Sequence, residues 1–377
     1  MKSWSLLGSL ALFSGLLLYL ALNQSRTPSN PSARIDELFV PSTLGKRPGA
    51  AVMVVQSGKV LHKKGYGLAD LNTNMPFDDN TNIRLASVSK QFTAMGVMIL
   101  AERGKLSYDD RLAKFFPEFL PCASEITIRQ LLHHTSGLLD HEKLFTDLKL
   151  IDSPWPRFSK TPVAEFEPTA LDSLNLLARQ RFLKFLPGTR FEYSNSGYVI
   201  LACIIEKVSG TSYDRFLKAA IFEPLGMSST VVADGRHVSV KNCARTYLVE
   251  NDEFRDVGYT PFDRIYGDDG VYSSLADLER WLPALKTDRL VGLATLEKAT
   301  TPGRLCDGEE TPYGFGLFLE QRLGMRTIGH MGIWAGAQTC IMDYGPGKLT
   351  VVILTNRDDF NCETLADKVA MIYLKDE

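Results

Sequence analysis

The chain has 377 residues, of which 45% are hydrophobic and 23% are charged. This is the composition of a folded globular protein with enough residues for one large domain or two moderate ones. The formal net charge of -2 at pH 7 shows no basic excess, so a nucleic-acid partner is disfavoured.

An uncharged, leucine-rich stretch of 17 residues lies near the N-terminus, at 6–22 ("LLGSLALFSGLLLYLAL"). As a helix it would be roughly 25 Å long, which is the short limit for spanning a bilayer. The sequence "ALNQS" fits a cleavage site poorly, which favours an uncleaved membrane anchor, with a cleaved signal peptide as the alternative. We therefore expect an anchor or signal segment (1–24), a polar linker (25–33) and an exported domain (34–375), either membrane-anchored or periplasmic or extracellular.

The exported domain begins with an α/β pattern. The segment "AAVMVVQSGKVLHKKGYGLAD" predicts two strands joined by a tight turn at Ser57-Gly58. A long apolar helix is expected over about 87–103. Residues 110–290 are mostly helical, in segments such as "TIRQLLHHTSG", "SLNLLARQRFL", "SGYVILACIIEKVSG", "YDRFLKAAIF" and "SLADLERWLPAL". Gly137 and Gly210 stand where glycines that end helices belong.

Strands return towards the C-terminus, in "YGFGLFLE", "MRTIGHMG", "AQTCIMDYG" and "LTVVILTN", and the helix "ETLADKVAMIYLK" closes the chain. Short turns between the late strands predict antiparallel pairing. The fold class is thus α/β (α+β), with an antiparallel sheet built from both chain ends and flanked by helices. Residues of about 110–290 form a mainly helical inserted subdomain, and a ligand cleft is expected between the two parts.

Several common sites are disfavoured by the residue patterns. Six cysteines without a C-x-x-C pair argue against structural zinc and against a thioredoxin-like centre, and they leave the disulfide pairing open. Cys203 is expected to be a buried free thiol. His133, His134, Asp140 and His141 could suggest a metal site. The expected end of a helix at "HHTSG" explains this stretch better. The glycines of "GYGLAD" precede no helix, so they are not a dinucleotide site. We expect no metal and no cofactor.

Three short motifs each occur once in the sequence, in a fixed order. Ser87-Val-Ser-Lys90 is the only S-x-x-K, Tyr193-Ser-Asn195 is the only Y-x-N, and His330-Met-Gly332 is the only H-x-G. In the expected fold they stand at a helix start, in a loop of the insertion and in a late strand. All three positions are expected to face the cleft.

With these motifs the chain resembles the serine β-lactamase and penicillin-binding-protein superfamily, in particular its class C-like branch of esterases, D-amino-acid peptidases and β-lactamases. The similarity extends over about 34–375 and includes "ITIRQLLHHTSGL", "IIEKVSG", "IFEPLGM", "YGDDGVYSSLADLERW", "YGFGL" and "VVILTN". The resemblance implies a β-lactamase/transpeptidase-like fold. His330 stands where class C β-lactamases carry lysine, which places an esterase or a peptidase before a true β-lactamase.

The residue types fit acyl transfer. A serine hydroxyl becomes a good nucleophile only when a neighbour takes its proton, and Lys90 lies on the same helical face as Ser87. To act as the base, Lys90 must be uncharged. Tyr193 could relay the proton to the leaving group, and Asn195 could hold Lys90 or bind a substrate oxygen. The resemblance implies an oxyanion hole formed by the backbone N–H groups of Ser87 and of Ile333, which follows Gly332.

Each of these residues also has an ordinary structural explanation. Ser87 could cap a helix, Tyr193 could be a core residue, Asn195 could cap the helix that begins near Ser196, and His330 could face solvent. Trp155, Trp334 and Tyr272 could form an apolar wall of the cleft or belong to the core.

We therefore expect a serine hydrolase that cleaves a small-molecule ester, amide or peptide through an acyl-enzyme on Ser87. Its catalytic residues would be Ser87, Lys90, Tyr193 and His330, and its substrate-binding residues Asn195, Gly332 and Ile333. The alternative is a catalytically silent, membrane-anchored binder of β-lactams or peptidoglycan peptides, which would have no need of the base. A conventional α/β-hydrolase is excluded because no G-x-S-x-G elbow occurs in the chain.

Overall fold

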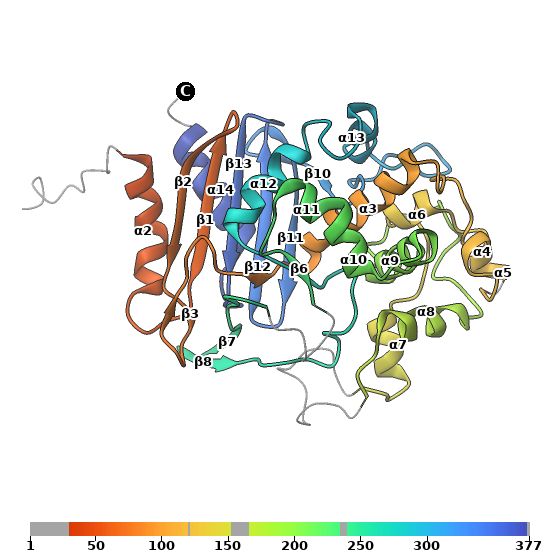
Figure 1. Ribbon diagram of the computed structural model, residues 1–377, viewed down its shortest axis with the longest axis horizontal. Coiled ribbons are helices and arrows are strands. Elements are labelled where there is room, and N and C mark those ends of the chain that lie inside the picture. Colours follow the sequence, from red (N-terminus) through yellow and green to blue (C-terminus); the bar gives the residue numbers. More distant parts are fainter. Residues whose placement is uncertain (1–29, 120, 152–165, 234–239, 375–377) are drawn as a thin grey trace, which may run out of the picture.

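A six-stranded antiparallel sheet forms the centre of the computed structural model, which describes residues 30–119, 121–151, 166–233 and 240–374 (Figure 1). The strand order is β10-β11-β12-β13-β1-β2. The strands are β1 (Ala50–Gln56), β2 (Lys59–Tyr66), β10 (Phe318–Arg322), β11 (Met325–Trp334), β12 (Ala337–Tyr344) and β13 (Leu349–Thr355). The sheet is thus built from both chain ends, as the sequence predicts.

The two chain ends meet at the middle of this sheet, where β1 pairs with β13 from Ala50↔Thr355 to Gln56↔Leu349. Every residue of β13 is buried, because helices cover both faces of the sheet there. The expected turn joins β1 to β2, and its two residues, Ser57 and Gly58, have φ values of 48° and 81°. Positive φ at both turn residues matches the right-handed twist of a two-residue hairpin.

Helices form a layer on each side of the sheet (Figure 1). On one side, α2 (Pro31–Thr43) and α14 (Cys362–Leu374) pack against each other and against the strands. Their core includes Ile35, Phe39, Val351, Ile353 and Val369. On the other side, α3 (Lys90–Glu102) and α12 (Leu275–Ala284) share one large core with the helical insertion.

The insertion is helical, with short strands that the sequence analysis missed. Its helices are α4 (Leu112–Phe115), α5 (Pro121–Ser124), α6 (Ile128–Leu132), α7 (His141–Asp147), α8 (Ala170–Ala178), α9 (Asn195–Ser209), α10 (Tyr213–Leu217), a π-turn (Lys218–Phe222) and α11 (Glu223–Leu225). Helix α13 (Leu293–Ala299) follows α12. Four short strands lie within the insertion: β6 (Val231–Val232), β7 (Tyr247–Glu250), β8 (Glu253–Asp256) and β9 (Val271–Ser273). Three more precede α3: β3 (Leu68–Asp70), β4 (Met75–Pro76) and β5 (Ile83–Arg84).

Some expected boundaries are corrected by the structure. Gly210 ends α9 with φ 72°, as predicted, but Gly137 ends no helix, because α6 already stops at Leu132. Instead, Gly137 has φ 72° in a turn whose backbone touches Phe185. Helix α2 begins at Pro31, within the expected linker, because Asn30 caps it and proline suits a first helical position.

Two predictions fall on residues that the structure does not describe. The apolar segment 6–22 lies outside the described residues, as does Trp155. Among the helices that are described, none has the length and apolar character required to cross a membrane. All six cysteines are free thiols, and Cys203 is buried, as expected.

Candidate active site

Ser87 and Lys90 lie together at the start of α3. The expected helix begins with a 3₁₀ turn, Ala86–Ser89, and continues as an α-helix from Lys90. Since a 3₁₀ turn has three residues, side chains at positions i and i+3 lie directly above each other. The Nζ atom of Lys90 is accordingly 3.0 Å from the Oγ atom of Ser87. Lys90 is fully buried, whereas Ser87 is partly exposed.

The amine of Lys90 has two further partners, and both are neutral acceptors. Its Nζ atom lies 2.9 Å from Oδ1 of Asn195 and 2.9 Å from the backbone oxygen of Asp268. A neutral amine has two N–H groups and one lone pair. The oxygens of Asn195 and Asp268 can only accept, so an uncharged amine here would donate to both of them and direct its lone pair at the hydroxyl proton of Ser87.

Asn195 supports Lys90 and does not cap a helix. Helix α9 begins at Asn195, and its N-cap is Ser194, whose side chain accepts a hydrogen bond from the backbone N–H of Gly197. Of the explanations offered by the sequence, the structure shows the contact with Lys90 and excludes the helix cap.

Tyr193 forms one wall beside this amine. The Nζ atom of Lys90 is 4.9 Å from the centroid of the Tyr193 ring. Phe318 stacks on the ring at 5.9 Å, and His134 packs against it at 4.3 Å. His134 also accepts a hydrogen bond from the backbone N–H of Ser194 through Nδ1, at 3.0 Å. Tyr193 is therefore fixed by neighbours from three separate segments.

His330 lies next to the Tyr193 ring and is 1% exposed. The two rings are 6.0 Å apart between centroids. The Nδ1 atom of His330 lies 2.5 Å from the carbonyl oxygen of Met331, so Nδ1 carries the proton and Nε2 accepts a bond from the hydroxyl of Tyr313 at 2.8 Å. Burial, the main cause, lowers the pKa of His330 to about 3. The imidazole is consequently neutral at physiological pH.

Gly332 allows β11 to approach the turn that carries Ser87. A Cβ atom at Gly332 would lie 2.2 Å from the backbone oxygen of Leu85 and 2.6 Å from Oγ1 of Thr339, so no side chain fits. The hydroxyl of Thr339 donates to the same Leu85 oxygen at 2.7 Å. Ala86 has a φ of 49°, a strained value for a residue with a side chain. The strand that holds Ile333 is thus locked against the Ser87 turn.

A buried arginine connects the two sides of this site. The Nη1 atom of Arg84 lies 2.6 Å from Asp263, and its Nε atom lies 3.0 Å from Asp269. The guanidinium also lies 4.6 Å from the Trp334 ring centroid, and the Trp334 indole N–H donates to Asp263 at 3.3 Å. Trp334 follows Ile333, and Asp269 follows Asp268. Arg84 therefore ties the Ile333 strand to the peptide whose carbonyl binds Lys90.

Trp334 and Tyr272 both lie near the guanidinium of Arg84. The guanidinium carbon is 4.6 Å from the Trp334 ring centroid and 5.9 Å from that of Tyr272. Two of the three aromatics proposed for a wall of the cleft or for the core thus lie beside a buried charged group.

Three side chains near Lys90 have the spacing of possible metal ligands: His141, Glu142 and Asp268, whose candidate atoms lie within 4.8 Å of one another. Burial is the main cause that raises the pKa of Glu142, to about 8, and that of Asp268. The raised values oppose the deprotonated carboxylates that a cation requires. We assign no metal here, and the expectation of a metal-free protein stays a prediction.

His133 and His134, which the sequence analysis also considered as metal ligands, bind other groups. The Nδ1 atom of His133 lies 2.9 Å from the backbone oxygen of Tyr313, and His134 bonds to Ser194 as described above. Of the four residues considered from the sequence, His141 alone belongs to the group of possible ligands that the described residues form.

Several contributors to the site escaped the sequence analysis. The Asp268 contact is made by a backbone carbonyl, which no residue-type pattern reveals. Tyr313, the partner of His330, lies in "YGFGL", and His134 lies in "HHTSG". Both segments contribute to the family resemblance, but the resemblance assigned no role to Tyr313 or His134. Arg84 had no signal beyond its closeness to Ser87 in the chain.

An antiparallel sheet flanked by helices, with a serine and a buried lysine at the start of a helix beside it, defines a serine hydrolase. The Beta-lactamase family profile matches residues 36–373. The chain belongs to the beta-lactamase family of serine hydrolases.

Sequence similarity to two named proteins supports this assignment. Penicillin-binding protein 4* of Bacillus subtilis (strain 168) is 33% identical over 347 residues, which are 88% of this chain and 73% of that protein. A D-aminopeptidase of Cereibacter sphaeroides (strain ATCC 17029 / ATH 2.4.9) is 30% identical over 325 residues, which are 84% of this chain. Those residues are 58% of the aminopeptidase, so the chain spans little more than half of its length.

Solved structures show the same fold. The octameric penicillin-binding protein homologue from Pyrococcus abyssi superimposes with a TM-score of 0.75 at 28% identity, over 88% of this chain and 74% of that one. The D-amino acid amidase from Ochrobactrum anthropi SV3 gives a TM-score of 0.74 at 22% identity, over 94% of this chain and 100% of that one. The second likeness concerns the fold alone.

Proposed function

We propose that the protein hydrolyses a small ester or amide through an acyl-enzyme on Ser87. One observation carries the proposal: the buried amine of Lys90 has neutral acceptors at two of its contacts and the Ser87 hydroxyl at the third. This arrangement directs the lone pair of an uncharged amine at the proton that the nucleophile must lose.

In the proposed reaction, Lys90 takes the hydroxyl proton while Oγ of Ser87 attacks the substrate carbonyl carbon. The C=O electron pair moves onto oxygen, and the backbone N–H groups of Ser87 and Ile333 stabilise that charge, typically by about 3 kcal/mol per donor. When the tetrahedral intermediate collapses, the proton passes from Lys90 through Tyr193 to the leaving amine or alcohol. Water then attacks the acyl carbon, and its proton returns through the same groups to Oγ of Ser87.

Two observations support a substrate class: the uncharged imidazole of His330 and the similarity to named relatives. Burial keeps this imidazole neutral, so it offers no positive charge to a substrate carboxylate, unlike the lysine of class C β-lactamases. The similarity to a D-aminopeptidase supports amides of D-amino acids as substrates. We therefore rank uncharged esters and D-amino-acid amides before anionic β-lactams.

A three-substrate comparison tests this ranking. The kcat/KM values of p-nitrophenyl butyrate, D-alanine p-nitroanilide and nitrocefin are measured on the parent and on His330→Lys. We expect nitrocefin to be the poorest substrate of the parent and to improve relative to the others in the variant. A parent that hydrolyses nitrocefin faster than both other substrates would overturn the ranking and leave a β-lactamase as the better assignment.

We also propose that the enzyme acts outside the cytoplasm, attached to a membrane through residues 6–22. The support is the length and uncharged character of that segment in the sequence. Cell fractionation followed by N-terminal sequencing tests the proposal. A membrane-bound chain with an intact N-terminus is expected, and a chain released after cleavage near residue 24 would show a signal peptide.

A further inference from the structure

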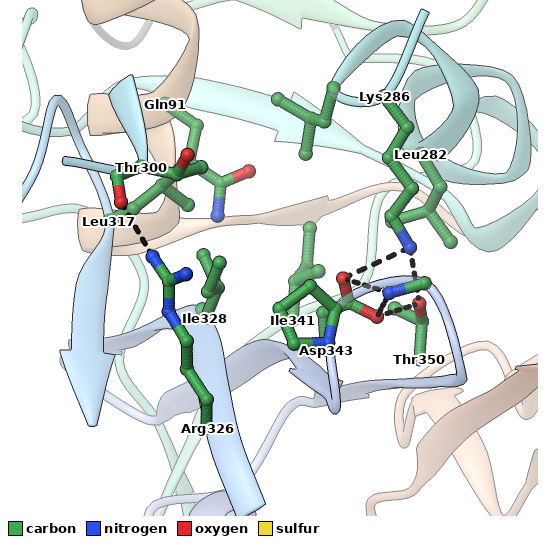
Figure 2. A pocket seen from close by; sticks show the side chains of 14 residues that line it. Gln91, Leu282, Lys286, Thr300, Leu317, Arg326, Ile328, Ile341, Asp343 and Thr350 are labelled. Atoms are coloured by element: carbon green, nitrogen blue, oxygen red, sulfur yellow. Dashed lines mark hydrogen bonds and ion pairs between the residues drawn. The ribbon is translucent and has the colours of Figure 1, made fainter. Parts of the chain in front are cut away.

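A second pocket lies on the face of the sheet that α3 and α12 cover (Figure 2). Its volume is about 370 Å³, within the usual range of small-molecule sites. Its lining comes from α3, the end of α12, β11, β12 and the start of β13. None of the proposed catalytic or substrate-binding residues is among the described residues that line it. The pocket is therefore distinct from the active site.

The floor of this pocket is apolar. Five aliphatic side chains line it: Leu282, Leu285, Leu317, Ile328 and Ile341. Ile328 and Ile341 project from neighbouring strands, and Figure 2 shows both between Arg326 on one side and Lys286 on the other. Such a surface favours the apolar part of a ligand over water.

The two cations differ in how far they are neutralised. The Nζ atom of Lys286 lies 3.0 Å from Asp343, so that charge has a partner. Arg326 donates from Nη2 to the backbone oxygen of Thr300 at 2.7 Å, and the described residues provide it with no carboxylate. The lining thus carries one net positive charge, on the Arg326 side.

A buried amide adds a donor without a partner. The indole N–H of Trp281 donates to Oε1 of Gln91 at 3.0 Å. An indole can only donate, so this contact fixes the amide orientation and leaves Nε2 as the atom without a bond. Gln91 is 2% exposed, and its Nε2 atom has no hydrogen-bond partner within the described parts of the chain. A buried donor without a hydrogen bond costs free energy, and a ligand oxygen that binds it would recover that cost.

From these features we propose that the pocket binds an amphiphilic monocarboxylate, such as a medium-chain alkanoate. The guanidinium of Arg326 matches the two oxygens of a carboxylate, the amide of Gln91 supplies another donor, and the aliphatic floor covers the alkyl chain. One net positive charge fits a monoanion. Since Gln91 follows Lys90 and Gly329 of the lining precedes His330, the ligand lies behind the active site, on the same helix and strand.

Isothermal titration calorimetry of the full chain with octanoate tests the proposal, with 1-octanol and octylamine as ligands of the same length. We expect saturable one-to-one binding of octanoate with a Kd below about 1 mM, and much weaker binding of the alcohol and the amine. Arg326→Gln should weaken binding at least about tenfold, as loss of a charge-assisted bond does. Arg111→Gln, which removes an exposed arginine outside the pocket lining, should bind like the parent.

A second variant probes the buried amide. Gln91→Glu keeps an oxygen for Trp281 and replaces the free donor by an acceptor, so octanoate binding should be lost. The proposal is overturned if octanoate does not saturate the protein, if octanol or octylamine binds as tightly, or if Arg326→Gln binds like the parent. The Arg326 side chain is exposed, so that variant remains informative even where Gln91→Glu does not fold.

Discussion

The side-chain oxygen of Asn195 lies 2.9 Å from Nζ of Lys90, at the first residue of α9 and 105 positions along the chain. This acceptor holds the amine without placing a formal charge beside it. Asn195→Asp would place a carboxylate at the same distance and favour the ammonium. We expect kcat/KM to fall at neutral pH and the acid limb of its pH profile to move to higher pH, because the added carboxylate favours the protonated amine.

The pH profile of Asn195→Ala provides the control for this prediction. That variant loses the contact without adding charge, so its activity should fall with little movement of the limb. An Asn195→Asp profile that falls uniformly, with no shift along the pH axis, would contradict the account of Asn195.

The assignment of Lys90 as the base predicts that charge alone does not suffice. Lys90→Arg keeps a cation that does not give up its proton, so it should be nearly as inactive as Lys90→Ala. Turnover of the preferred ester is measured on both, with Lys114→Arg at an exposed helical site as the matched control. If Lys90→Arg retains most of its activity, Lys90 acts as a fixed charge and another group must take the proton.

Arg84 should act on catalysis through the groups that it positions. Arg84→Lys keeps the charge, but a single ammonium cannot reproduce the separate bonds to Asp263 and Asp269. We expect the free energy of unfolding to drop by about 2 kcal/mol, the value of one charge-assisted hydrogen bond. We also expect kcat to fall more than KM changes, because the Ile333 strand and the Asp268 carbonyl lose their common support.

The half-exposed Arg245, which pairs with Asp256, offers the control Arg245→Lys, whose kcat should match that of the parent. An Arg84→Lys enzyme with a normal kcat and reduced stability would confine Arg84 to a structural role.

Buried histidines should make the fold sensitive to acid. Burial, the main cause, lowers the pKa of His133 to about 4 and that of His330 to about 3. Between about pH 6.5 and 4 the unfolded chain binds protons at these sites and the folded chain does not, so stability falls as pH falls. Each histidine should cost on the order of 3 kcal/mol over this range. Urea unfolding at pH 7, 6, 5 and 4 measures the effect.

His134 allows a separate check, because burial also holds its pKa well below the usual value. Its φ of 59° and its bond from Ser194 both suit asparagine, so His134→Asn removes a titrating group with little backbone strain. The variant should lose less stability than the parent between pH 7 and pH 4. Equal losses in the two proteins would show that His134 takes no part in the acid response.

The sequence predicted the elements whose signals are local. Apolar runs and a Ser57-Gly58 turn located β1 and β2, and the unique motifs located Ser87, Lys90 and Asn195, which the structure brings together. It could not predict contacts that depend on tertiary packing. The Asp268 carbonyl meets Lys90 because of the path of a loop, and Arg84 reaches two aspartates about 180 positions away. The predicted helix end at Gly137 is wrong, because a turn in a loop can require a positive φ just as a helix end does.

The central claim, that Ser87 is the nucleophile with Lys90 as its base, is tested most directly by covalent labelling. The full chain and its Ser87→Ala variant are incubated with a fluorophosphonate and with the preferred ester, and intact mass and peptide mapping locate any adduct. We predict one adduct on the Ser87 peptide of the parent, none on the folded variant, and a loss of kcat of about 10⁶-fold in that variant. An adduct that persists in Ser87→Ala, or one that maps to another residue of the parent, would contradict the account.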